Sequence, residues 1–417
     1  MRVVVTTESR YVRTPDGGVW TRGAPDYRIW QRYLSAFDEV RVVARVADVA
    51  DVPAGALRVD GDAVRVHALP YYVGPAQYLR QRARIGRAVA RAAGPGDAVI
   101  LRVPSALGSL LAAERRRRGL PYALEVVGDP YDVFAPGVVR HPLRPLLRRR
   151  FTDRLRRECA AATAVAYVTE SYLQRRYPHR GDAPAAALSS VDLPGDAFVA
   201  RPRPAARCAG ARGDLVAVGT LDQLYKGFDT LIAAVARLAA AGVQVRLTHV
   251  GAGRYDDHLR RLADQLGVGH RVDFVGQVPP GAPLHAHLDA ADLFVMPSRT
   301  EGLPRALVEA MARALPAIGT AVGGIPELLA TDDLVAPDDP DGLAVAVREM
   351  LADPARMAGA SARNLDRATA FARPALEPRR ADFYRTVRAR CQPTPGDAPG
   401  RRGTTDRLPA ARRPNGG

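Results

Sequence analysis

Short apolar runs alternate with helical segments in two series along this chain, and this alternation constrains the fold more than any other feature. In the first series, the runs expected to be strands cover residues 1–6, 40–46, 97–102, 122–127 and 164–169. In the second series, they cover residues 215–218, 244–250, 272–275 and 293–296. Helical segments, for example 27–37 and 228–241, separate the runs. Such alternation predicts an α/β fold with parallel, doubly wound sheets.

The two series also define the expected domains. Periodicity disappears between residues 191 and 213, where Pro, Ala and Arg dominate, and this indicates a linker. We therefore expect an N-terminal domain over residues 1–190 and a C-terminal domain over 214–372. A further helix is expected over 373–391, and its packing back onto the N-terminal domain is one option. Apolar residues almost vanish over 392–417, which predicts a disordered tail.

The composition excludes several classes of protein. Hydrophobic residues make up 47% of the 417, as in ordinary soluble domains. No apolar run approaches the roughly 18 residues that span a bilayer, so a cytoplasmic location is expected. Cys159, Cys208 and Cys391 show no metal-ligand spacing, and neither a zinc site nor a disulfide framework is expected.

The formal charge of +16 invites a nucleic-acid or membrane interpretation. Nearly every basic residue is Arg, however, and Ala, Gly, Pro and Val are abundant, which indicates a GC-rich coding bias. Nucleic acid is not an expected partner, because the sequence lacks the usual binding motifs. The arginine-rich segments near 80–91 and 144–157 are expected to be solvated helices. Peripheral contact with anionic lipid at the inner face of a membrane stays open.

The segment from Met296 to Leu328 contains the first candidate site. A buried strand leads into a loop with Glu301, and a helix begins after Pro304. Free N–H groups at a helix start favour an anion, while Glu301 and Glu309 can accept hydrogen bonds from sugar hydroxyls. This combination suits a nucleotide sugar. The plainer alternative makes Glu301 a solvated loop residue and pairs Glu309 with Arg313 on the helix surface.

Lys226 is the only lysine in the chain. It stands between a buried strand and a helix that begins near Phe228. A compact ammonium group with three donors suits a phosphate in a narrow space. A chance surface lysine is the alternative, and the Glu301 segment downstream makes that alternative less attractive.

The motifs around these residues follow one another in an order that resembles a known family. VGTLDQLYKGFDTLIAAV, VGAG, FVGQV, PSRTEGLPRALVEAMA and GTAVGGIPEL occur between residues 214 and 330. They resemble the GT4-type (group 1) retaining glycosyltransferases, whose GT-B fold places two Rossmann-like domains across a central cleft. Before residue 190 the likeness is architectural only. The N-terminal domain is then expected to bind the acceptor.

The resemblance implies an activity. A sugar would move from a UDP- or GDP-type donor to an acceptor hydroxyl, with retention of anomeric configuration. The setting would be bacterial glycan or secondary-metabolite biosynthesis, and the acceptor would be a small molecule, a glycan or a lipid-linked molecule. No metal ion or other cofactor would be needed.

The resemblance also assigns roles to residues. Lys226 would contact the donor diphosphate, Glu309 the ribose hydroxyls, and Glu301 the transferred sugar near its anomeric carbon. The backbone near Arg305 and Ala306 would hold the diphosphate. The full donor-binding set comprises Gly18, Thr220, Lys226, Gly253, Val275, Glu301, Leu303, Arg305, Ala306 and Glu309.

One departure from the family pattern concerns charge at the diphosphate. The family usually has Arg at the position of Thr220, which can offer only a hydroxyl. One positive charge is therefore missing. Arg305 is a candidate replacement, and a solvated helix residue is its alternative.

In the N-terminal half, two further positions are candidates. Family members often carry His-Asp where this chain has Gly128 and Asp129, so Asp129 alone is a candidate catalytic contact to the sugar. An Asx-type turn before Pro130 is the alternative. Gly17 and Gly18 would let the backbone approach the donor phosphate, or form an ordinary turn.

Formal D-x-D patterns occur at residues 60–62 and 339–341. Both lie in predicted turns without flanking strand and helix, so a turn is the preferred interpretation and no metal site is expected.

Two other functions remain open at this point. A nucleotide-sugar 2-epimerase of the same fold would convert the donor without any acceptor. A non-catalytic basic protein would bind anionic lipid or nucleic acid in a salt-sensitive manner, and Glu309→Ala would leave that binding unchanged.

Overall fold

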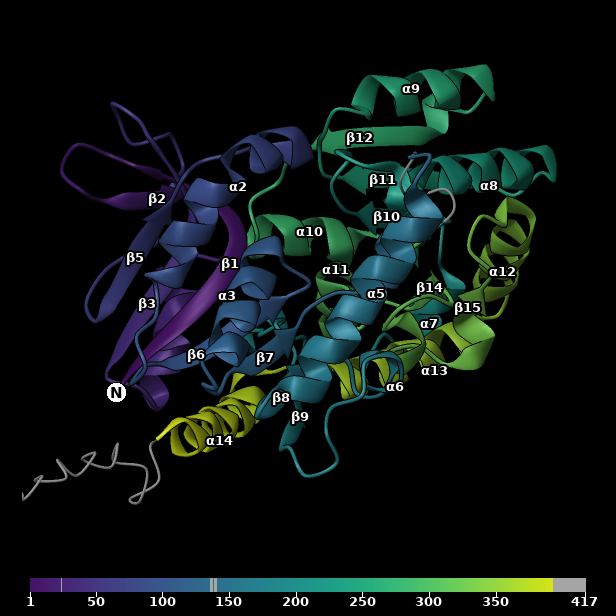
Figure 1. Cartoon of the computed structure of the whole chain (residues 1–417). Coiled ribbons are helices and arrows are strands. Elements are labelled where there is room, and N and C mark those ends of the chain that lie inside the picture. The colour runs from purple at the N-terminus through teal and green to yellow at the C-terminus, as the bar shows by residue number, and fades with distance from the viewer. Residues whose placement is uncertain (24, 136–137, 139–140, 393–417) are drawn as a thin grey trace, which may run out of the picture.

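The computed structural model describes residues 1–23, 25–135, 138 and 141–392. The disordered tail was predicted over residues 392–417, and residues 393–417 of it lie outside the described part of the chain. Two α/β domains lie side by side, each built on one sheet (Figure 1). This confirms the predicted fold class of two doubly wound domains.

Seven parallel strands form the body of the N-terminal sheet. Their spatial order is β5 (Val64–Leu69), β3 (Glu39–Asp48), β1 (Arg2–Arg13), β6 (Ala98–Val103), β7 (Ala123–Val126), β8 (Ala164–Tyr167) and β9 (Ala185–Ala187). Two short strands extend the sheet at the end of β1: β2 (Val19–Thr21) pairs antiparallel with β1, and β4 (Leu57–Arg58) pairs antiparallel with β2. The strand order reverses between β1 and β6, which defines a topological switch point.

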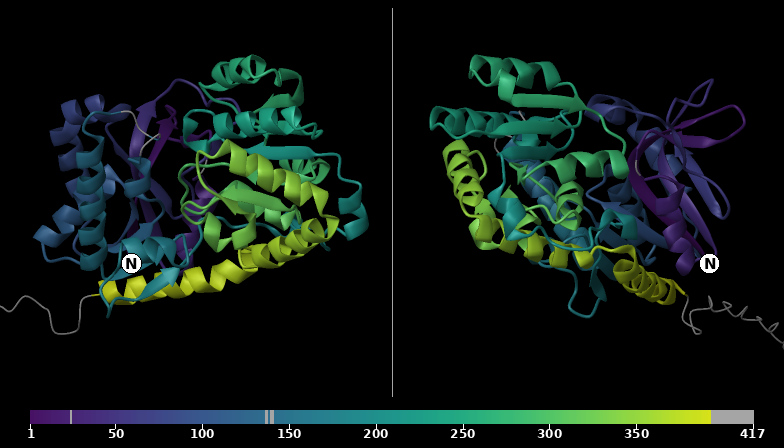
Figure 2. Two further views of the ribbon diagram at one scale, coloured as in Figure 1. Left: turned by 90° about the vertical axis from the view of Figure 1, so that its right-hand side faces the viewer. Right: turned by 180° about the vertical axis from the view of Figure 1, so that it is seen from behind.

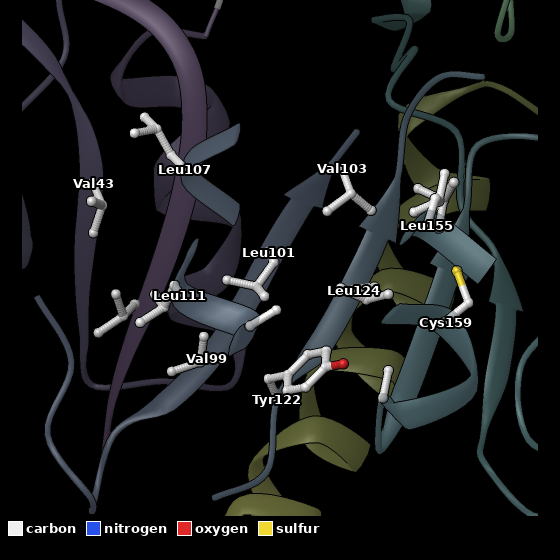
Figure 3. Packing of buried hydrophobic residues seen from close by; sticks show 14 of the residues in the cluster. Val43, Val99, Leu101, Val103, Leu107, Leu111, Tyr122, Leu124, Leu155 and Cys159 are labelled. Carbon is white, nitrogen blue, oxygen red and sulfur yellow. The ribbon is translucent and has the colours of Figure 1, made fainter. Parts of the chain in front are cut away.

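Helices cover both faces of this sheet. The buried residues of α2 (Gly74–Ala90), α3 (Ala106–Arg117) and α5 (Arg144–Ala161) share one core cluster with the strands. Figure 3 shows Leu111 of α3 near Leu101 and Val99, and Leu155 and Cys159 of α5 on the side of Leu124. The opposite face is covered by α1 (Tyr27–Trp30), the 3-10 helix η1 (Gln31–Ser35) and α14 (Arg373–Cys391).

The predicted single helix over residues 27–37 is wrong in type. The α-helix ends at Trp30 and a 3-10 helix continues to Ser35. Trp30 and Tyr33 both face the core, and their spacing of three residues suits the tighter repeat of a 3-10 helix.

The C-terminal sheet has six parallel strands. Their order is β12 (Val272–Gly276), β11 (Arg246–Val250), β10 (Asp214–Val218), β13 (Leu293–Met296), β14 (Ala317–Thr320) and β15 (Leu334–Val335). Its helices are α8 (Phe228–Ala240), α9 (Asp256–Gln265), α10 (Ala282–Ala290), α11 (Arg305–Ala312), α12 (Pro340–Ala352) and α13 (Pro354–Thr369). The order reverses between β10 and β13, so this domain has a switch point of its own.

Helix α8 illustrates how the sequence produces these elements. Its buried residues Phe228, Leu231, Ile232, Val235 and Leu238 recur every three or four positions and form one apolar face. No Gly or Pro interrupts the helix. The apolar face therefore packs on the sheet.

The linker between the domains, residues 191–213, contains two short helices. It contains η2 (Gly195–Ala197) and α7 (Ala205–Ala209). The N–H of Leu193 donates to Phe371 O at 3.0 Å, and the N–H of Arg373 donates to Leu193 O at 2.9 Å. These bonds join the linker to the start of α14. Figure 2 shows α13 and α14 running along the base of both domains, and α14 ends against strands β6 and β8.

A carboxylate from the C-terminal domain also holds the domains together. Glu327, in η5 (Ile325–Glu327), accepts from the N–H groups of Glu170, Ser171 and Tyr172 at 2.6, 2.9 and 2.6 Å. These donors open α6 (Tyr172–Arg176), so the contact satisfies N–H groups that a helix start leaves free.

The remaining short elements are α4 (Pro130–Val133), η3 (Leu224–Lys226), η4 (Gly269–Arg271) and η6 (Thr331–Asp333). Within the described part of the chain, no helix combines the length and apolarity that a membrane crossing requires.

The packing of α14 generates a stability prediction. Phe383 is buried in the N-terminal core beside Tyr384 and Val387. Phe383→Ala should lower the free energy of unfolding of the N-terminal domain by about 3–5 kcal/mol, because it leaves a cavity. Chemical denaturation followed by circular dichroism measures this. Glu377→Ala on the exposed face of the same helix is the matched control, and equal stability of the two variants would contradict the packing described here.

Candidate functional site

Two loops that follow neighbouring strands meet at the switch point of the C-terminal sheet. Lys226 ends η3 after β10, and Glu301 follows β13. Lys226 Nζ donates to Glu301 Oε1 at 2.6 Å, and Ser298 Oγ donates to the same oxygen at 2.7 Å. Ligands bind outside the carboxyl ends of parallel strands at such a point. The structure thus places Lys226 in direct contact with Glu301, two residues that the sequence predicts to share one site.

The ion pair determines the charge state of the lysine. Burial alone would lower the pKa of Lys226, but the carboxylate of Glu301 outweighs burial and raises that pKa above its ordinary value. The ammonium group therefore stays charged at neutral pH, and it is available to a phosphate that displaces the carboxylate.

Arg299 fastens the Lys226 loop to the Glu301 loop. Its N–H donates to Tyr225 O at 2.7 Å, and its guanidinium donates to Leu224 O. The same guanidinium makes a bidentate pair with Asp229 of α8, with both distances 2.9 Å. Bidentate arginine contacts fix orientation as well as distance. Sequence reasoning missed Arg299, because arginine is common in this chain.

Gly227 allows the two loops to approach. Its φ is +71°, in the left-handed region. A Cβ at this position would lie 1.9 Å from Pro297 O, which no side chain can tolerate. A residue other than glycine would separate the loops and move Lys226 away from Glu301.

Thr220 and Gly253 lie together where β10 and β11 end. The Thr220 hydroxyl donates to Asp222 at 3.1 Å. A Cβ on Gly253 would lie 2.3 Å from the N–H nitrogen of Asp222, so Gly253 is required for close loop packing. Arg254 follows directly, and its Nε donates to Asp222 O at 2.7 Å. A guanidinium that sequence reasoning missed thus lies at the loop where Thr220 replaces the usual arginine.

The start of α11 lies directly after the Glu301 loop. Pro304 is its N-cap residue and supplies no side-chain cap, so the first N–H groups of the helix stay open to an anion. Ala306 is half-buried in the first turn. Arg305 is exposed, and its guanidinium lies 3.9 Å from Glu309 and 3.5 Å from Ser190 O. Burial raises the pKa of Glu309, and Arg305 opposes this shift.

Leu303 and Val275, both predicted donor contacts, lie apart from the Lys226–Glu301 pair in the contacts that they make. Leu303 is partly buried and packs against core clusters of both domains, so its side chain belongs to the domain boundary. Val275 is a partly exposed residue of β12, whose parallel neighbour is β11.

The predicted sugar contact of Asp129 is wrong for this conformation. Its side chain is fully buried. It caps α4 by accepting from Tyr131 N at 2.8 Å, pairs with Arg176 at 2.6 Å and accepts from the Tyr177 hydroxyl. Burial raises the pKa of Asp129. The structure therefore supports the Asx-type turn that the sequence had left as the alternative.

The predicted phosphate contact of Gly18 is also wrong. Gly18 closes the turn between β1 and β2, where the N–H of Thr14 donates to Gly18 O at 3.0 Å. This hairpin lies on the side of the N-terminal domain that faces away from the C-terminal domain (Figures 1 and 2). Gly18 packs against Arg58 and Trp20 of the same domain.

The D-x-D segment at residues 60–62 lies at a turn, as preferred from the sequence. The turn predicted for residues 339–341 is wrong, because these residues form the N-cap and the first turn of α12. Asp60 accepts from Val19 N at 2.9 Å, and Asp339 caps α12 by accepting from Gly342 N at 2.8 Å. Among the residues that the structure describes, no three His, Cys, Asp or Glu side chains are grouped to hold a metal ion.

A buried histidine contacts the start of the loop that follows β10. His249 of β11 is 1% exposed, and its Nε2 lies 3.1 Å from Gly219 O. Its Nδ1 has no hydrogen-bond partner within the described ranges. Burial lowers the pKa of His249 to about 4. The ring is therefore neutral at physiological pH.

The sequence of this chain is similar to a described family and to several known proteins. Residues 212–353 match the family described as glycosyl transferases group 1. A GDP-mannose-dependent alpha-(1-6)-phosphatidylinositol monomannoside mannosyltransferase of Mycolicibacterium smegmatis is 30% identical over 337 residues, which cover 72% of this chain and 85% of that protein. Protein CapJ of Staphylococcus aureus is 26% identical over 75% of this chain and 77% of its own length.

Solved structures share the fold. Sucrose-phosphate synthase from Thermosynechococcus elongatus superposes with a TM-score of 0.67 and 21% identity, covering 94% of this chain and all of that one. Anabaena HepE in complex with UDP-glucose gives a TM-score of 0.62 at 16% identity, over 92% of this chain and 98% of that one. These likenesses confirm the GT-B architecture.

His249 predicts an acid-sensitive stability. An unfolded histidine titrates near pH 6.5, whereas His249 in the folded chain titrates at about pH 4. Between these values the unfolded state binds the extra proton, so stability should fall as the pH drops, by about 3 kcal/mol at most. Denaturation at several pH values should show a shallower fall for His249→Gln. The exposed His270→Gln is the control and should follow the wild type; identical curves for all three would contradict the prediction.

Proposed function

This chain belongs to the group 1 glycosyltransferase family, and from that premise we propose that it moves a sugar from a nucleoside diphosphate donor to an acceptor hydroxyl with retention at the anomeric carbon. The observation that carries the proposal is the Lys226–Glu301 pair at 2.6 Å, beside the uncapped start of α11. Relatives named as GDP-mannose-dependent mannosyltransferases and as a putative colanic acid biosynthesis enzyme support a nucleotide-sugar donor and glycan biosynthesis.

The phosphate half of the proposed site combines one charge with open N–H groups. Lys226 would exchange Glu301 for the donor diphosphate, and the N–H groups near Arg305 and Ala306 would bind the same anion. Arg254, held at the Thr220 loop, supplies the second cation in this proposal. Its position is more suitable than that of Arg305, which reaches toward Ser190 O at the end of the N-terminal domain.

The sugar half would use the two glutamates. Glu309 would accept hydrogen bonds from the ribose hydroxyls. Glu301, freed from Lys226, would face the transferred sugar and stabilise positive charge as the anomeric carbon loses its phosphate. The bond from the anomeric carbon to the diphosphate oxygen breaks, and the bond to the acceptor oxygen forms on the same face. The acceptor proton passes to the departing diphosphate.

The acceptor would bind at the other switch point, in the N-terminal domain. A cavity of about 380 Å³ opens there between α2, α3 and α5. Its walls are mainly apolar, with Tyr72, Phe134 and Phe151 among them, and Glu8 and Arg154 add charge. Glu8 accepts from Ser105 Oγ at 2.8 Å where β6 ends, so the cavity reaches the carboxyl edge of the sheet. Apolar walls with a few polar groups are typical of sites for small amphipathic ligands.

Binding of diphosphates tests the donor site. Lys226→Ala should weaken binding of both pyrophosphate and a nucleoside diphosphate by about 2–3 kcal/mol, because a charged hydrogen bond is lost. Glu309→Gln should weaken only the nucleoside diphosphate, since pyrophosphate has no ribose. Calorimetry with UDP, GDP and pyrophosphate measures this. Unchanged nucleotide affinity of Lys226→Ala would overturn the assignment.

Product analysis tests the reaction. Proton NMR of the product should show the anomeric configuration of the donor, and activity should persist in excess EDTA because no metal ion is required in this proposal. An inverted product, or loss of activity that Mg²⁺ or Mn²⁺ restores, would contradict retention or metal independence respectively. The same assay without acceptor detects a donor epimerase.

A further inference from the structure

A second cavity lies between the domains, on the face of the N-terminal sheet opposite α2, α3 and α5. Its volume is about 190 Å³, and η1, the ends of β6 to β9, α14 and Arg305 of α11 surround it. We call it the interdomain cavity. The charged side chains that line it are Arg32, Arg102, Glu125, Arg305 and Arg380. Apart from Arg305, whose backbone belongs to the proposed diphosphate site, its charged residues have no role in the proposed transfer reaction.

Part of this charge is balanced locally. Arg102 pairs with Glu125 at 2.7 Å. The hydroxyls of Tyr33 and Tyr384 also donate to Glu125, at 2.9 and 3.2 Å. Glu125 therefore has its partners in place and cannot neutralise a further arginine.

The other arginines share a single carboxylate. Asp192, in the linker, lies 3.0 Å from Arg32, 3.0 Å from Arg373 and 3.2 Å from Arg380. Burial alone would raise the pKa of Asp192, yet the three guanidinium groups hold that pKa below its usual value. Arg373 is half exposed to water and does not line the cavity. Asp192 is therefore shared by two cavity-lining arginines, Arg32 and Arg380, and one positive charge remains in excess.

Arg305 does not relieve this excess. Its nearest carboxylate, Glu309, is 3.9 Å away. Four guanidinium groups therefore line the cavity, and their carboxylate partners are Glu125, Asp192 and Glu309.

Arg32 is the least satisfied of these groups. Within the described residues it donates no hydrogen bond that meets geometric criteria, and its one ion pair is with Asp192. Its side chain is one-fifth exposed, toward the cavity that it lines. Burial lowers the pKa of Arg32, and Arg380 lowers it further. Like charges held together out of water are costly unless a counter-ion joins them.

We propose that the interdomain cavity binds a phosphate group, supplied by inorganic phosphate or by a small phosphorylated metabolite. A phosphate supplies both the missing negative charge and acceptors for planar guanidinium donors. The cavity can hold a phosphate group, because its volume of about 190 Å³ is many times the roughly 10–15 Å³ that one water needs. The ligand would touch Arg32 of the N-terminal domain, Arg380 of α14 and Arg305 of the C-terminal domain. Its binding would therefore stabilise one arrangement of the two domains.

Calorimetry on the full chain tests the site with two probes, inorganic phosphate and glucose 6-phosphate. Wild type should bind at least one of them, and Arg32→Gln should weaken binding about tenfold or more, because a charged hydrogen bond is lost. Arg305→Gln, an exposed position, should do the same without endangering the fold. Arg84→Gln on the exposed face of α2 removes the same charge elsewhere and should change nothing. Tighter binding of glucose 6-phosphate identifies a metabolite site, and equal binding identifies a phosphate site.

Lys226→Ala separates this site from the proposed donor site. Phosphate binding should survive in that variant, whereas nucleoside diphosphate binding should be lost. Loss of phosphate binding in Lys226→Ala would place the anion in the donor site and overturn the inference. Wild-type affinity in both Arg32→Gln and Arg305→Gln, or no binding to the wild type, would also overturn it. Failure of the donor proposal would instead show as nucleotide binding that Lys226→Ala leaves intact.

Discussion

The ion pair between Lys226 and Glu301 is the interaction on which the C-terminal site depends. It joins loops that follow β10 and β13, the two strands between which the sheet order reverses. Two opposite charges taken out of water are stable only with close geometry and further hydrogen bonds. Ser298 and the Arg299 contacts to the η3 turn provide these. The carboxylate occupies the place on the lysine that the diphosphate of the proposed donor would take.

A site residue could be predicted from the sequence where the residues that determine its position lie close to it along the chain. Lys226, Glu301 and Glu309 stand in short segments in which strand, loop and helix follow directly, so their positions could be predicted from the sequence. Asp129 could not, because its partners Arg176 and Tyr177 lie more than 45 residues away. The phosphate contact predicted for Gly18 was wrong for a different reason. Strand β1 runs on to Arg13, and this length carries the turn away from the domain boundary.

Arginine abundance explains the residues that sequence reasoning missed. In this chain a lysine is unique and therefore informative, whereas an arginine conveys almost nothing by its identity. Arg299 and Arg254 are distinguished only by what they contact, namely carbonyl groups of the loop after β10 and, for Arg299, the carboxylate of Asp229 in α8. No pattern along the chain separates them from the solvated arginines of α5, whose buried residues are Thr152, Leu155, Glu158 and Cys159.

The same reasoning applies to the net charge, which describes the chain as a whole and not any one site. Three arginines converge on Asp192, in the segment where the linker joins α14. Arg305, the first residue of α11, lines the same cavity as Arg32 and Arg380. If a phosphate draws Arg305 toward Arg32, the start of α11 is held in place as well. Occupancy of the interdomain cavity and affinity for the donor would then be coupled, and by thermodynamic linkage each ligand would change the affinity for the other by the same factor.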